Sequence, residues 1–139
     1  MDGPEDDQVI SGRLHMRMDR QRAALERADF QLRVIIGAGA LSLVIGSPDV
    51  MAAQIDHLKV LNKRRNVDIR VLPWRVGAHL GLSGAFTLMD FHDPDDPPVV
   101  YEESLAGARY LEQEAQVAEY RRTFTLLSQQ AVPIEEYTQ

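Results

Sequence analysis

The segment NVDIRVLPWRVGAHLGLSGAFTLMDF, residues 66–91, contains two runs in which apolar and polar side chains alternate. Alternation with a period of two is typical of strands, because successive side chains of a strand point to opposite faces. The first run, 67–72, predicts a strand that directs Val67, Ile69 and Val71 inward and stops at Pro73. The second run, 84–91, predicts another strand.

Two further strands are expected on either side of these runs. The segment HDPDDPP, residues 92–98, contains two Asp-Pro steps and predicts a turn that joins 84–91 to a strand over 99–103 in a hairpin. Residues 32–36 also alternate, with Leu32, Val34 and Ile36 on one face. We therefore expect a sheet of about four strands.

Three segments show the three- and four-residue spacing of apolar side chains that is typical of amphipathic helices. The first covers about residues 9–28, and its apolar stripe is Ile10, Leu14, Met18 and Leu25. The second starts at Ser47 and Pro48, a favourable N-cap and first helical position, and Asn66 can close it. The third covers residues 117–131 and ends before Pro133.

The order helix, strand, helix, three strands, helix predicts one α/β or α+β domain over residues 9–139, with about three main helices packed on the sheet. A length of 139 residues with 45% hydrophobic content fits a single core. Residues 1–8 are mostly acidic and contain Gly3 and Pro4, so we expect a loose N-terminus there.

The composition excludes several classes of protein. The chain contains no cysteine, which excludes disulfides, thiolate catalysis and cysteine-ligated metals. No apolar run approaches the ~20 residues that span a membrane, and the acidic start is unlike a signal peptide, so we expect a cytoplasmic protein. The formal net charge of −6 opposes binding to nucleic acid or to an anionic membrane.

A basic stripe runs beside the apolar stripe of the first helix, and it consists of Arg13, Arg17, Arg20 and Arg27. Two interpretations are open: a contact with an anion or nucleic acid, or a solvated helix edge that pairs with acidic residues elsewhere. The negative total charge favours the second interpretation.

The segment LRVIIGAGALSLVIG, residues 32–46, looks like the opening of a dinucleotide-binding fold, but Ser42 occupies the third position of the G-x-G-x-x-G pattern. A glycine turn between a buried strand and a short apolar helix accounts for it. The four histidines form neither an H-x-H motif nor an i, i+4 pair. We therefore expect no nicotinamide, flavin or metal cofactor.

The candidate ligand-binding or catalytic surface lies where the loop 74–86 meets the strand 99–103. Its glycines allow close approach to a ligand, and its aromatic rings supply apolar area. His79 and Glu103 could supply polar contacts, or act as base and acid if the chain is an enzyme. The alternative is that the aromatic residues are core and Glu103 pairs with an arginine. The predicted members are Trp74, His79, Phe86, Tyr101 and Glu103, with Val99, Tyr101 and Glu103 on one face.

Several stretches of the sequence are together similar to one known protein family. They are RMDRQ (17–21), VMAAQIDHL (50–58), the segment 66–91, VVYEESLAG (99–107) and AEYRRTFTLLSQQAVP (118–133). In these stretches the chain resembles the C-terminal domain of actinobacterial XRE-family regulators, an antitoxin-like group, over about residues 9–136. The resemblance implies a domain that senses a small molecule or a small partner protein. It carries no catalytic residue over to this chain, and the helix-turn-helix that precedes the domain in that family is absent from this sequence.

Three alternatives follow from the resemblance. The chain is an excised sensor domain, a stand-alone partner-binding protein, or a stand-alone enzyme without a cofactor, such as an isomerase or cyclase of a biosynthetic pathway. The initial methionine with an acidic leader favours a stand-alone gene. A homo-oligomer is possible in each case. We expect no specific binding of duplex DNA by this chain, because its net charge opposes the phosphate backbone.

Overall fold

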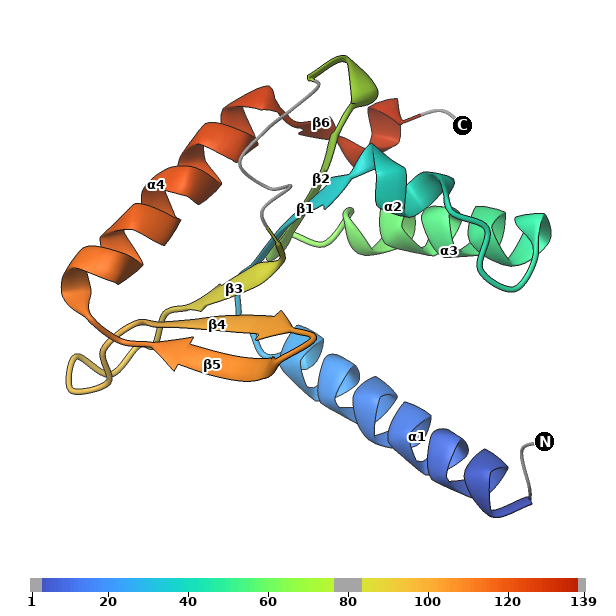
Figure 1. Ribbon diagram of the computed structural model, residues 1–139. Coiled ribbons are helices and arrows are strands. Elements are labelled where there is room, and N and C mark those ends of the chain that lie inside the picture. The colour runs from blue at the N-terminus through green and yellow to red at the C-terminus, as the bar shows by residue number, and fades with distance from the viewer. Residues whose placement is uncertain (1–3, 77–83, 138–139) are drawn as a thin grey trace.

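The computed structural model describes residues 4–76 and 84–137 and contains helices and strands in an α+β arrangement (Figure 1). None of the described helices is both long and apolar enough to cross a membrane. In chain order the elements are α1 Pro4–Glu26, β1 Leu32–Gly37, α2 Ala38–Ser42, α3 Pro48–Leu61, β2 Val67–Leu72, the 3-10 turn η1 Trp74–Val76, β3 Phe86–Met89, β4 Val99–Ser104, β5 Gly107–Leu111, α4 Glu114–Gln130, β6 Val132–Pro133 and the 3-10 turn η3 Ile134–Glu136.

The strands form two three-stranded sheets. In the first sheet the order is β1-β2-β6, with β1 parallel to β2 and β6 antiparallel to β2. In the second sheet β3, β4 and β5 form an antiparallel meander. The predicted α+β class is confirmed, but the expectation of one sheet of about four strands is wrong. The expectation also missed two strands: β5, which is exposed along most of its length, and β6, which has only two residues, one of them a proline.

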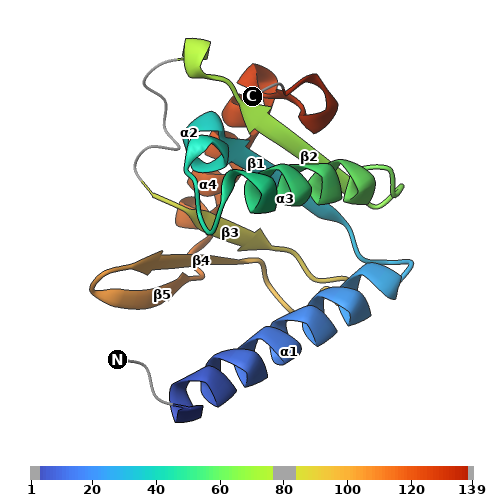
Figure 2. The same cartoon turned by 90° about the vertical axis from the view of Figure 1, so that its right-hand side faces the viewer.

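The main core lies between the β1-β2-β6 sheet, α2, α3 and η3. The predicted inward side chains of β2 are confirmed, because Val67, Ile69 and Val71 are all buried. Figure 2 shows α3 lying across β1 and β2, where Ile55 supplies its contact with the core. Ile134 of η3 is fully buried in the same cluster, so the residues after the last helix complete this core.

Both ends of α3 are held by side chains. The hydroxyl of Ser47 accepts a hydrogen bond from the backbone N–H of Val50 at 3.2 Å, which confirms the predicted N-cap. The C-cap is Asn62 and not the expected Asn66. The amide oxygen of Asn62 accepts from the backbone N–H of Ile69 at 2.7 Å, and its nitrogen donates to Glu135. Asn62 therefore connects α3 to β2 and to η3.

The last helix, α4, joins the two sheets. It runs from the end of β5 to the start of β6 and packs against β2 on one side and against β3 and β4 on the other (Figure 1). Its predicted apolar stripe faces inward, with Val117 and Leu127 buried. The Arg33 guanidinium of β1 lies over the ring of Phe124 at 5.0 Å. The position of the second sheet relative to the first therefore depends on α4.

The first helix, α1, extends away from the rest of the molecule (Figures 1 and 2). It begins at Pro4, five residues before the expected start. Its stripe is exposed at Ile10, Leu14 and Met18, and only Leu25 packs against the core. The apolar periodicity was correctly identified, but most of this stripe has no partner within the described part of the chain.

Candidate functional site

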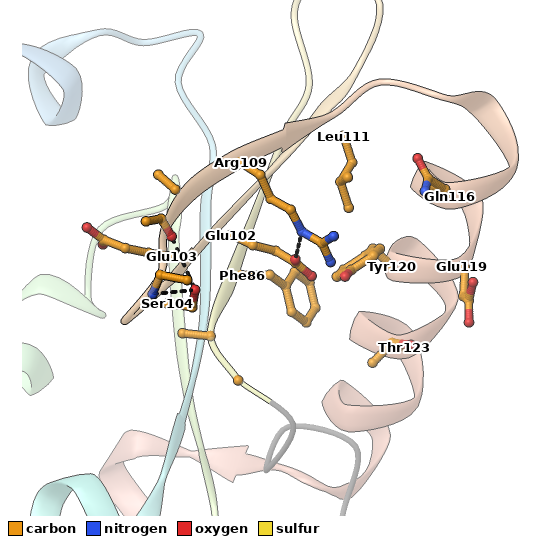
Figure 3. A pocket seen from close by; sticks show the side chains of 15 residues that line it. Phe86, Glu102, Glu103, Ser104, Arg109, Leu111, Gln116, Glu119, Tyr120 and Thr123 are labelled. Atoms are coloured by element: carbon orange, nitrogen blue, oxygen red, sulfur yellow. Dashed lines mark hydrogen bonds and ion pairs between the residues drawn. The ribbon is translucent and has the colours of Figure 1, made fainter.

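A pocket of about 690 Å³ lies between the β3-β4-β5 sheet and α4 (Figure 3). Four side chains of α4 line one wall at three- and four-residue spacing, which places them on one face of the helix. They are Gln116, Glu119, Tyr120 and Thr123. The opposite wall is the hairpin β4–β5 together with the start of β3. The pocket therefore forms only because the second sheet and α4 pack together.

The floor of the pocket is aromatic and apolar. Phe86 of β3 and Tyr120 of α4 meet edge to face, with ring centroids 5.0 Å apart and planes at 78°. Phe86 pairs with Glu102 in the strand register, so these two side chains share one face of the sheet. Leu111 of β5 lines the same pocket. This arrangement offers a surface on which an aromatic or aliphatic group of a ligand can pack.

The polar groups around this floor are mainly acidic. The Glu102 carboxylate accepts a hydrogen bond from the Arg109 guanidinium at 2.7 Å across the β4–β5 pair. Glu102 is 21% exposed, whereas Arg109 is 67% exposed. Glu103 and Glu119 are also among the lining residues, but the Glu103 side chain lies on the outer face of the sheet, with Tyr101, and points away from the Phe86–Tyr120 pair (Figure 3). The residues that line the pocket therefore include three acidic residues and one arginine.

A second ion pair connects α4 to the end of β3. The two terminal nitrogens of the Arg121 guanidinium donate to the two oxygens of the Asp90 carboxylate, at 3.0 and 2.7 Å. The hydrogen bond from Arg121 lowers the pKa of Asp90 below its ordinary value. Because both side chains are about half exposed, the pair orients α4 and contributes little to stability.

The structure brings together two of the five predicted site residues. Phe86 and Glu103 line the pocket. Trp74 lies elsewhere: it is 72% exposed, and its ring packs so closely over Gly39 of α2 that an added Cβ there would meet it at 3.2 Å. His79 lies outside the described residues.

Tyr101 lies on the other face of the second sheet. Val99, Tyr101 and Glu103 share one face of β4, as the alternation predicts, but the fully buried side chain of β4 is Val100 on the opposite face. Tyr101 instead packs against Tyr110 of β5, with ring centroids 5.1 Å apart. Partial burial, and then the nearby Glu103 carboxylate, raise the pKa of Tyr101. The alternation of 99–103 gave no indication of which face is inward, because both faces carry apolar residues.

Sequence reasoning missed most of the pocket. Leu111 and Arg109 belong to β5, a strand that was not expected. Tyr120 was recognised only as part of the apolar stripe of the last helix. The pattern Gly107-Ala-Arg-Tyr-Leu after a short turn was the available signal for β5.

The described residues contain no group of three or more His, Asp or Glu side chains placed to hold a metal ion. Over residues 7–75 and 84–137, no polar or charged side chain is buried. Glu103 is exposed, and its side chain lies on the same face of the sheet as Tyr101. The geometry provides contacts for a ligand more clearly than it provides an acid–base pair.

Comparison with protein-family models gives a match that covers nearly the whole chain. The profile of a family described as a domain of unknown function, DUF5753, matches residues 2–138. Neither the curated proteins nor the solved structures give a match. Because the matched region contains all but the first and last residues, the chain belongs to the DUF5753 family.

Proposed function

We propose that this chain is a binding module whose pocket between α4 and the β3-β4-β5 sheet takes a small molecule with an apolar body and a cationic or hydrogen-bond-donating group. The observation that carries the proposal is the edge-to-face pair of Phe86 and Tyr120 in a pocket lined by three acidic residues and one arginine. Binding sites combine apolar walls with a few polar groups that fix orientation. An alkyl amine that carries an aromatic ring meets both requirements.

The resemblance to the sensing domain of XRE-family regulators supports the same role. In such a module, occupancy of the pocket would change the contact between α4 and the second sheet, because the ligand would touch both. The cationic group of an amine would lie near Glu119 at the edge of the pocket, whose carboxylate takes part in none of the ion pairs of the described residues. The exposure of Glu103 supports a binding role over acid–base catalysis.

The proposal is tested with 2-phenylethylamine as the probe and 3-phenylpropionate as its counterpart of opposite charge. We expect the amine to bind and the carboxylate to bind at least about fivefold more weakly, which corresponds to about 1 kcal/mol. Backbone amide shifts in NMR spectra should change at Phe86, Tyr120 and Thr123. Equal binding of both probes would contradict the role of the acidic residues that line the pocket.

Three variants locate the site. Tyr120→Ala should weaken binding of the amine, whereas Tyr120→Phe keeps the ring and should retain it. Leu126→Ala is the matched control, because Leu126 is an exposed residue of the same helix that does not line the pocket. If Tyr120→Ala folds normally and binds the amine as tightly as the parent chain, the ligand site lies elsewhere.

A further inference from the structure

Apart from its C-terminal turn, the first helix packs against no other part of the described chain. Every side chain from Asp7 to Ala23 is exposed, including Ile10 at 61% and Leu14 at 58%. A helix in water without tertiary contacts is marginal even for good helix-forming sequences, and Gly12 in its interior weakens it by about 1 kcal/mol. A stably formed α1 therefore requires another surface against its apolar stripe.

The second sheet has an outer face that also lacks a helix. α4 covers the face that carries Phe86 and Val100, and no described helix packs closely on the other face. The strand register places four apolar or aromatic side chains on that uncovered face: Met89, Val99, Tyr101 and Tyr110. Tyr110 is 64% exposed. This outer face can accept an amphipathic helix.

The charges of the two surfaces are complementary. Residues 13–22 of α1 contain four arginines and one aspartate. Residues 89–112, which include β4, β5 and the loop that joins β3 to β4, contain seven carboxylates and one arginine. Two of these carboxylates, Asp90 and Glu102, are held in ion pairs, and the exposed loop carboxylates include Asp93, Asp95 and Asp96. Attraction between the two surfaces would orient the helix on the sheet.

The dimensions also match. Three strands spaced about 4.8 Å apart present a face about 10 Å wide, which equals the diameter of a helix with its side chains. The C-terminal end of α1 is held against its own core by Leu25 and by the Arg64 guanidinium, which donates to the Leu25 carbonyl at 3.4 Å. From that end α1 is directed away from the rest of its own chain (Figure 1). The complementary surface must therefore come from another molecule.

We propose that α1 of one copy packs on the outer face of the β3-β4-β5 sheet of a second copy, with the contact repeated by two-fold symmetry. Each copy then supplies one helix and one sheet face, and neither is left exposed. The ligand pocket lies on the opposite face of the same sheet. The dimer therefore does not depend on the proposed function, and each can fail without the other.

Cross-linking tests which surfaces meet. The chain has no native cysteine, so single cysteines are unique. Leu14→Cys in one preparation is mixed with Tyr110→Cys in another and treated with a short bis-maleimide. We expect a cross-linked dimer in the mixture and little in either variant alone. Efficient self-linking of L14C would instead place α1 against α1. A double variant that links only within its own chain would place α1 on its own sheet. Either result overturns the proposal.

Molar mass tests the assembly itself. Light scattering should give twice the chain mass of 15.7 kDa at high protein concentration. Arg17→Glu should raise the dimer dissociation constant by about tenfold, because it places a carboxylate against an acidic surface. Arg122→Glu makes the same charge change at an exposed position of α4 and should leave the constant unchanged. A protein that stays monomeric at all accessible concentrations, or equal effects of the two variants, would refute the dimer.

Discussion

Replacing Ile134 by alanine tests the inference that the residues after α4 complete the main core. Ile134 is fully buried against the cluster that includes Val71 and Ile55. The substitution removes three carbon atoms, worth about 0.8 kcal/mol each in transfer free energy, or about 2.4 kcal/mol. The cavity left behind adds to this loss, and isoleucine-to-alanine changes in cores cost about 2–5 kcal/mol. We expect the free energy of unfolding to fall by about 3–4 kcal/mol.

Urea unfolding followed by circular dichroism measures this loss, with an unchanged m-value as the sign that the same cooperative unit unfolds. At roughly 4 °C per kcal/mol for a domain of this size, Tm should fall by about 12–16 °C. Ile134→Val should cost only about 1 kcal/mol. The matched control is Leu105→Ala in the fully exposed β4–β5 turn, expected within about 0.5 kcal/mol of the parent. A loss below about 1 kcal/mol for Ile134→Ala would show that η3 is not part of the core.

Three further substitutions test other contacts of the fold. Ser47→Ala should lower the free energy of unfolding by about 1 kcal/mol, because the Val50 N–H loses its cap, and Ser47→Asp should restore it. Asn62→Ala should cost about 1–3 kcal/mol in urea unfolding, since the Ile69 N–H then lacks its side-chain partner; an effect equal to that of Leu105→Ala would contradict this. Asp90→Asn should cost below about 1 kcal/mol at neutral pH. Because folding lowers the pKa of Asp90, this difference is present above its ordinary value of 3.8 and should vanish as the pH falls through the lowered pKa.

The alternation of residues 67–72 was enough to predict β2 and its inward face, because a strand buried on one face repeats strictly every two residues. The helices α3 and α4 were predictable for the same kind of reason, and Ser47 with Pro48 fixed the start of α3. The division into two sheets was not predictable. It depends on whether strands that are far apart in sequence pair with each other, and local periodicity carries no information on that pairing.

The pocket was predicted only in part, and the reason lies in β4. Its sequence Val99-Val-Tyr-Glu-Glu has apolar residues on both faces, so either register fits the pattern. The structure resolves this through Val100, whose burial turns Glu102 toward α4 and Tyr101 away from it. A change of one residue in phase exchanges the two faces of a strand, which is why Tyr101 and the pocket are on opposite sides.

The pairing of β6 with β2 has a consequence for protein synthesis. The ribosome produces the chain from its N-terminus, and domains generally fold as units. In this chain β1, α3 and β2 are made early, but β2 gains its second neighbour, and the core its Ile134 side chain, only when residues 132–136 emerge. Until then β2 has an unpaired edge that can bind other strands. The nascent chain therefore remains incompletely folded until nearly all of these residues have been translated, and a ribosome that stalls within α4 would expose an aggregation-prone intermediate.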